Sequence, residues 1–180
     1  ITPNINTEHR SYFKEEDQLG ERENPLLFSI RDSRTNLWVN PLFMFTSLND
    51  NINPVIDGVY LETEKERIEL TGRQIIPPQS YRLLIDTTDF IVKYGIPLVP
   101  YQVKVRYLGR VVYSLSLDSL VNREGILKVE GNPQGESPFT NEGMINGGIL
   151  GITGGKGFLE VEVIDYRGNK TSKQFPLNQD

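Results

Sequence analysis

Apolar and polar positions alternate over short runs along much of this chain, and a period of two indicates β-strands. The clearest run is residues 101–107, YQVKVRY, in which every second residue is aromatic or aliphatic. A turn at Gly109 and Arg110 leads into a second apolar run at residues 111–117. These two runs predict an antiparallel hairpin whose polar side chains face the solvent.

Similar runs recur from residue 55 to the end of the chain and predict a series of short strands. The expected strands lie at residues 55–62, 67–70, 81–86, 126–129, 145–152, 158–164 and 171–176, with a helical turn at 118–122. The chain contains no alanine, which argues against long helices. Short strands separated by turns at these intervals favour a two-sheet antiparallel β-sandwich. The corner at 165–169, DYRGN, resembles the closing hairpin of bacterial immunoglobulin-like domains, and this resemblance implies an immunoglobulin-like sandwich.

A separate pair of short strands precedes the sandwich, within residues 25–45, PLLFSIRDSRTNLWVNPLFMF. Apolar residues occupy every second position from 26 to 30, a polar turn follows at 32–36, and a second apolar run covers 37–39. Pro41 closes this run, because proline lacks a backbone donor and restricts the residue before it. Two strands cannot bury their own apolar face, so this hairpin must pack on another part of the protein.

The same hairpin resembles the end of the lysostaphin-like zinc endopeptidases, which cut peptidoglycan cross-links. Their last core strand reads roughly H-x-H-F-E-I-R-D and is followed by a loop and a strand that ends in V-N-P-L. The matching residues here are Phe28, Ile30, Arg31, Asp32, Val39, Asn40, Pro41 and Leu42. The family's two histidines are replaced by Pro25 and Leu27, and its glutamate by Ser29. Because proline and leucine cannot ligate zinc, the resemblance implies the peptidase scaffold with a degenerate active site.

These patterns predict an all-β chain with three parts. The parts are a polar arm at residues 1–24, the peptidase-like hairpin remnant at 25–48, and the immunoglobulin-like β-sandwich at 55–180. The boundary falls in residues 46–54, which are rich in the turn formers asparagine and aspartate and end at a proline.

The resemblance implies a non-catalytic binding or scaffolding module of a bacterial cell-envelope protein, in the periplasm or outside the cell. A protein or a cell-wall glycan is the expected partner. A second interpretation stays open, in which the chain is the C-terminal accessory part of an active zinc endopeptidase whose metal ligands lie upstream of Ile1. An intact H-x-H motif in that upstream sequence would favour this second interpretation.

Composition narrows the chemistry that these 180 residues offer. The chain has no cysteine, one histidine (His9) and a net charge of −5 without a basic block. A zinc site built from histidine and cysteine is therefore excluded within this chain, and no nucleic-acid partner is expected. No long apolar run is present, so we expect no membrane insertion. We predict no catalytic residue, no enzymatic activity and no cofactor.

Acidic side chains recur at alternate positions of predicted strands. Glu62 and Glu64 form one such pair, and Glu160 and Glu162 form another. Alternate residues of a strand share a face, so both pairs are expected to lie on solvated faces.

An asparagine- and aspartate-rich run at the domain boundary suggests a calcium site. Residues 49–54, NDNINP, resemble the N-D-N-x-P linker that binds calcium between cadherin repeats, with one extra residue before the proline. The calcium candidates are Asp50, Asn51 and Asp57, because oxygen ligands are the ones calcium prefers. This interpretation makes the chain a calcium-rigidified adhesion repeat, whereas a plain asparagine-rich turn explains the same residues without a metal.

Overall fold

The computed structural model describes residues 30–44, 49–91, 95, 97–123, 126–129 and 137–178. The predicted polar arm, His9, and the positions of Pro25, Leu27 and Ser29 lie outside these residues. The described part of the chain is all-β, as predicted, and its one helix is a short 3₁₀ turn, η1 (Pro41–Met44). No helix in this part is long and apolar enough to cross a membrane.

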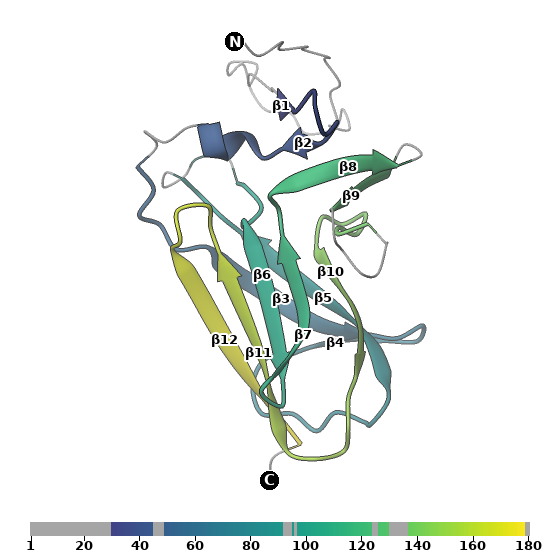
Figure 1. Cartoon of the computed structure of the whole chain (residues 1–180). Coiled ribbons are helices and arrows are strands. Elements are labelled where there is room, and N and C mark those ends of the chain that lie inside the picture. The colour runs from purple at the N-terminus through teal and green to yellow at the C-terminus, as the bar shows by residue number, and fades with distance from the viewer. Residues whose placement is uncertain are drawn as a thin grey trace, which may run out of the picture.

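Two four-stranded antiparallel sheets form a β-sandwich (Figure 1). The first sheet has the order β10–β5–β3–β4, made of Ile145–Gly151, Ser80–Thr88, Val55–Glu62 and Arg67–Glu69. The second has the order β12–β11–β6–β7, made of Lys170–Leu177, Gly157–Ile164, Gln102–Tyr107 and Arg110–Ser116. The predicted sandwich and its two hairpins, β6–β7 and β11–β12, are therefore confirmed.

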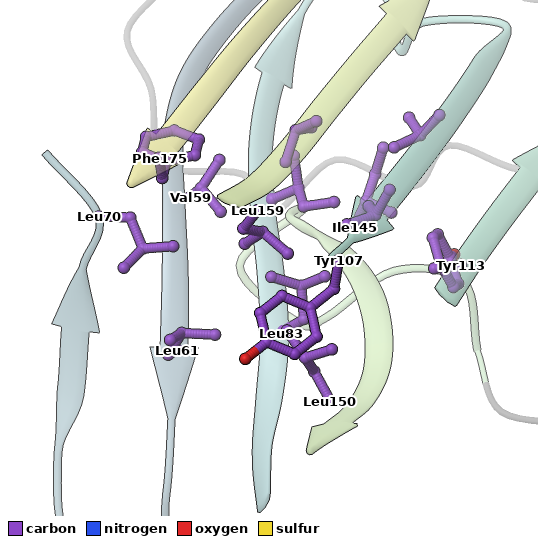
Figure 2. Close-up of a cluster of buried hydrophobic side chains, with 14 of the residues drawn as sticks. Val59, Leu61, Leu70, Leu83, Tyr107, Tyr113, Ile145, Leu150, Leu159 and Phe175 are labelled. Carbon is purple, nitrogen blue, oxygen red and sulfur yellow. The ribbon is translucent and has the colours of Figure 1, made fainter. Parts of the chain in front are cut away.

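The core lies between these two sheets and follows from the alternation in the sequence (Figure 2). In β11, Leu159, Val161 and Val163 are fully buried, while the glutamates between them are half-buried on the outer face. In β5, Leu83 and Ile85 face the same interior and are also fully buried. Each such side chain contributes about 1.5–3 kcal/mol through the removal of apolar surface from water.

A third, smaller sheet lies at one end of the sandwich and contains the predicted N-terminal hairpin (Figure 1). Its order is β1–β2–β8–β9, made of Ile30–Arg31, Trp38–Val39, Ser119–Arg123 and Ile126–Val129. β1 and β2 pair as an antiparallel hairpin around the predicted turn, which confirms that pairing, whereas positions 26–29 of the predicted first strand lie outside the described residues. β2 also pairs with β8, so the hairpin and a segment inserted in the sandwich share one sheet.

Local sequence explains the tight turn of the β1–β2 hairpin. The Asp32 carboxylate accepts hydrogen bonds from the Arg34 backbone N–H (2.8 Å) and from the Thr35 hydroxyl (2.9 Å). These bonds hold the pKa of Asp32 below its ordinary value. Asn36 has φ +64°, a left-handed conformation that asparagine tolerates better than most residues.

The helical turn predicted at residues 118–122 is wrong, because residues 119–123 form strand β8. Its partners are β9, which follows directly, and β2, which lies some eighty residues earlier in the chain. The Asn40 backbone N–H donates to the Asp118 carbonyl (3.0 Å), and the Asn40 side-chain amide donates to the Leu117 carbonyl (3.1 Å). These contacts are set by distant residues, so the local pattern of 118–122 does not reveal them.

Candidate metal centre

Three buried carboxylates meet at one end of the sandwich. Asp50 precedes β3, Asp89 follows β5, and Asp165 follows β11. One oxygen from each residue lies within 4.8 Å of the other two, and the three residues are 4%, 1% and 1% exposed. Among the described residues, this is the one group of three or more acidic, histidine or cysteine side chains close enough to share a metal ion.

The corner between β11 and β12 fixes the carboxylate of Asp165. Its Oδ1 accepts hydrogen bonds from the backbone N–H groups of Arg167 and Asn169, both at 2.8 Å, and its Oδ2 accepts from Asn169 Nδ2 at 2.6 Å. Gly168 has φ +91°, which favours glycine at this position. The motif D-x-x-G-N thus encodes a turn that folds back around its own first side chain.

Asp50 is held against the same corner from the segment before β3. Asn169 Nδ2 donates a hydrogen bond to the Asp50 carbonyl oxygen (3.1 Å). Asp50 Oδ1 accepts from the Ile52 backbone N–H (3.0 Å), whereas Asp50 Oδ2 is buried and has no hydrogen-bond partner. A buried acceptor without a partner is costly, because water that solvated it in the unfolded chain has been removed.

Asp89 reaches the cluster from the end of β5. Its backbone forms an isolated bridge with Leu98, with hydrogen bonds of 2.9 Å and 2.8 Å in the two directions. Its Oδ1 accepts a hydrogen bond from the Phe90 backbone N–H (2.9 Å). The bridge fixes the Asp89 backbone directly after the end of β5.

Burial and mutual repulsion make it unfavourable for all three carboxylates of the cluster to be ionised at once. Burial, together with the smaller effect of the charges of Asp165 and Asp50, raises the pKa of Asp89 to about 6. Burial also raises the pKa of Asp50. None of the ion pairs formed among the described residues includes these three carboxylates. Ionised, the cluster therefore lacks a partner that cancels its charge.

A tyrosine and an arginine lie beside the cluster. The Tyr166 hydroxyl is buried without a hydrogen-bond partner, and burial together with the charge of Asp50 raises the pKa of Tyr166. The exposed Arg167 guanidinium lies 5.9 Å from the centre of the Tyr166 ring. Its positive charge offsets only part of the rise in the pKa of Asp50. The described surroundings therefore supply one unpartnered hydroxyl oxygen, and Arg167 forms no ion pair with the three carboxylates.

The structure brings together only one of the residues that the sequence proposed as calcium candidates. Asp50 belongs to the cluster. Asn51 is exposed and donates from Nδ2 to Asn49 Oδ1 (3.1 Å). The exposed Asp57, in β3, accepts a hydrogen bond from the Thr88 hydroxyl (2.8 Å).

Two members of the cluster were missed by the sequence reasoning. Asp165 carried a signal, because the D-x-x-G-N motif was recognised as a turn, but not as a source of a buried carboxylate. Asp89 follows a strand and carries no local signal that separates it from any other loop aspartate. The three residues approach one another only because β3, β5 and β11 bring their ends together.

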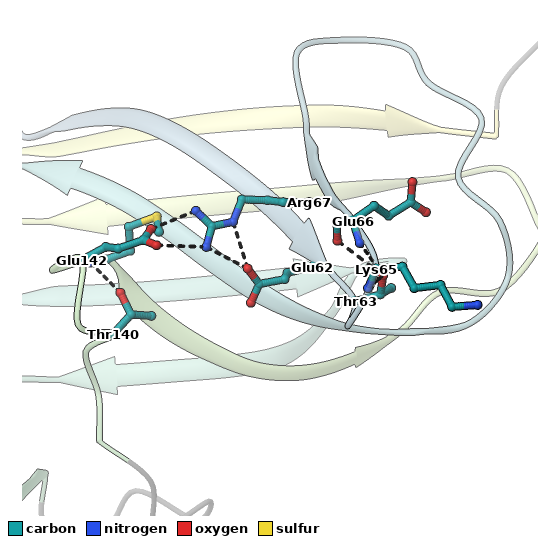
Figure 3. Close-up of polar contacts among 8 residues, drawn as sticks. Glu62, Thr63, Lys65, Glu66, Arg67, Thr140 and Glu142 are labelled. Carbon is teal, nitrogen blue, oxygen red and sulfur yellow. Dashed lines mark hydrogen bonds and ion pairs between the residues drawn. The ribbon is translucent and has the colours of Figure 1, made fainter.

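Glu62 of the first predicted carboxylate pair contacts Arg67 (Figure 3). Glu64 lies in the turn after β3, which ends at Glu62, so the prediction that these two share a strand face is wrong. Glu160 and Glu162 both lie in β11 and face Arg106. Arg67 contacts Glu62 at 2.7 Å and Glu142 at 2.8 Å, and Glu62 also lines an open groove of about 540 Å³. On the other sheet, Arg106 lies 3.6 Å from Glu160 and 3.9 Å from the second glutamate of that pair. Such surface pairs contribute at most about 1 kcal/mol each, so they describe a solvated face rather than a reactive site.

The fold and the cluster define an antiparallel β-sandwich with three buried carboxylates at one end. Residues 53–180 match the model of a protein family of uncharacterised function, and the chain belongs to this family. The match covers both sandwich sheets, Asp89 and Asp165, and it begins three residues after Asp50. Comparisons with curated proteins and with solved structures give no significant match.

Proposed function

We propose that this chain is a non-catalytic scaffolding module that holds the segment preceding the sandwich in a fixed position. The observation that carries the proposal is the shared sheet, in which β2 of the N-terminal hairpin pairs with β8. Trp38 lies opposite Leu120, and Val39 lies opposite Ser119. An isolated two-stranded hairpin is at best marginally stable in water, whereas four strands with a packed face are stable.

A second attachment supports the same proposal. Asn40 bonds to the 117–118 segment on one side of the connection between hairpin and sandwich. Asp50, on the other side, is buried beside Asp89 and Asp165 and bonds through its carbonyl to Asn169. With both ends of the connection held, the hairpin has little freedom to rotate relative to the sandwich.

The cellular setting is proposed from the resemblance of the hairpin to lysostaphin-like endopeptidases. On this basis the chain works in a bacterial cell envelope, periplasmic or extracellular, with a protein or a cell-wall glycan as partner. The family's two zinc-binding and catalytic histidine positions correspond to Pro25 and Leu27 here, and neither side chain offers a metal ligand. We therefore propose that the peptidase-like strand serves as a scaffold rather than as part of an active centre.

The proposal is tested with the chain as it stands. Its zinc content is measured by elemental analysis after dialysis, and purified peptidoglycan is incubated with it while released fragments are followed by chromatography. We expect sub-stoichiometric zinc and no release of fragments, and co-sedimentation with peptidoglycan would identify the glycan as the partner. Stoichiometric zinc together with cleavage would overturn the proposal and favour the endopeptidase interpretation.

A further inference from the structure

We propose that Asp50, Asp89 and Asp165 bind one calcium ion, which fastens the segment before β3 to the end of the sandwich. The role given to the ion rests on the proposed function, because the ion would strengthen the attachment of Asp50 to the end of the sandwich. The chemistry of the site rests on the geometry of the cluster.

The spacing of the oxygen atoms suits calcium. Calcium binds oxygen ligands at about 2.3–2.6 Å, so two oxygens on opposite sides of one ion are about 4.8 Å apart and all other pairs are closer. One oxygen from each of the three carboxylates lies within 4.8 Å of the other two, which is close enough for a single calcium ion to contact all three. Magnesium binds at about 2.0–2.1 Å and requires a tighter, near-octahedral arrangement.

An independent sign of a missing ligand comes from a single atom. Asp50 is 4% exposed, its carboxylate belongs to the cluster, and Oδ2 is buried without any hydrogen-bond donor. A protein donor, an ordered water or a cation is needed to compensate such an atom. The hydroxyl of Tyr166, beside Asp50, is buried and lacks a partner as well.

The charge of the site favours a cation over a water molecule. Three ionised carboxylates carry three negative charges in a buried volume, and none of them joins an ion pair with a described lysine or arginine. A water molecule satisfies hydrogen bonds but leaves the repulsion between the carboxylates in place, whereas a divalent cation offsets it directly. All three side chains are hard oxygen ligands, which favours calcium over zinc.

The cluster is also built in the way that metal ligands are commonly held. Two backbone N–H groups and the Asn169 amide orient the Asp165 carboxylate, and the Phe90 N–H orients Asp89. Hydrogen bonds of this kind fix ligating carboxylates. Asp165 Oδ1 accepts two of them, whereas Asp165 Oδ2 and Asp89 Oδ1 accept one each and retain a second lone pair for a metal.

The test compares thermal unfolding of the full chain in calcium chloride and in a chelator. For the wild type we expect calcium, at a concentration about 100-fold above its Kd, to raise Tm by about 5–10 °C. Asp50→Asn and Asp89→Asn remove one charged ligand each, and either should weaken calcium binding at least about tenfold. Asp57→Asn is the matched control, because it changes an exposed aspartate outside the cluster, and it should keep the full calcium shift.

Calorimetric titration of the wild type with calcium and with magnesium completes the test and does not depend on any variant folding. Binding of one calcium ion, tighter than magnesium, supports the inference. A wild-type Tm that calcium and chelator leave equal, a calcium shift that persists in both cluster variants, or tighter binding of magnesium would overturn it. These results leave the zinc and peptidoglycan assays untouched, so failure of the calcium site and failure of the proposed function are separate outcomes.

Discussion

Replacing Asp89 by asparagine should remove much of the pH dependence of stability in the calcium-free protein. Asp89 is 1% exposed, and its burial, with the charges of Asp165 and Asp50, raises its pKa from the ordinary value of 3.8 to about 6. The folded state therefore binds a proton more tightly than the unfolded state does. The contribution of Asp89 to stability is greatest well below pH 3.8, where it is protonated in both states, and it is lost as pH rises through about 6.

The size of this effect follows from the two pKa values. A shift of one pKa unit corresponds to about 1.4 kcal/mol, so the rise from 3.8 to about 6 costs the folded state at most about 3 kcal/mol at pH 7. Asparagine has nearly the same shape, carries no charge and retains an oxygen for the Phe90 N–H. Asp89→Asn should therefore be more stable than the wild type at pH 7 in chelator, and similar to it at pH 4.

Urea unfolding in chelator between pH 4 and pH 7.5 measures the free energy of unfolding of the wild type and of Asp89→Asn at each pH, with Asp57→Asn as the control. The control aspartate is exposed and lies outside the cluster, so the loss of stability that Asp89 causes should persist in its variant. Two results would refute the reasoning. One is a stability difference between the wild type and Asp89→Asn that is the same at pH 4 and at pH 7, and the other is a free energy of unfolding that depends on pH as steeply in Asp89→Asn as in the wild type.

Two further substitutions test the attachments and the core. Asn40→Ala removes two side-chain hydrogen bonds, the one donated to the Leu117 carbonyl and the one accepted from the Leu42 N–H. It should lower the free energy of unfolding, measured in urea, by about 1–2 kcal/mol. Asn51→Ala is the control at an exposed position, and it should change this free energy by less than about 0.5 kcal/mol. Equal effects of the two would contradict the docking role of Asn40. Gly147→Ala places a methyl group 2.9 Å from atoms of a fully buried leucine and should cost about 1–3 kcal/mol, while Gly72→Ala, with no atom within 4 Å, should be nearly neutral in thermal unfolding. If Gly147→Ala left the Tm unchanged, the core beside Gly147 would have space for a methyl group, contrary to the structure.

The strands of the sandwich were predictable because their signal is local. The alternation in β6 and β11 specifies both the strand and its buried face, and the Asp165–Asn169 corner carries its own turn chemistry. β8 was not predictable, because its five residues become a strand through pairing with β2 and β9. The pattern of 118–122 contains no information about those partners.

The carboxylate cluster was predictable only at one residue. Asp50 stood out because it lies in an asparagine-rich run at a domain boundary, where calcium ligands are common. Asp89 and Asp165 join it through the packing of strand ends that are far apart in the sequence. Neighbours in the chain, such as Asn51 and Asp57, turned out to face solvent, because proximity in sequence does not determine which side chains are buried together.

The central claim is that the N-terminal hairpin and the sandwich form one cooperative unit. Trp38 is the only tryptophan of the chain and lies in β2, so its fluorescence reports on the hairpin, while far-ultraviolet circular dichroism reports mainly on the sandwich strands. Urea unfolding of the wild type followed by both signals should give coincident transitions with the same midpoint. A tryptophan transition complete at a urea concentration where the circular dichroism is still native would contradict the claim.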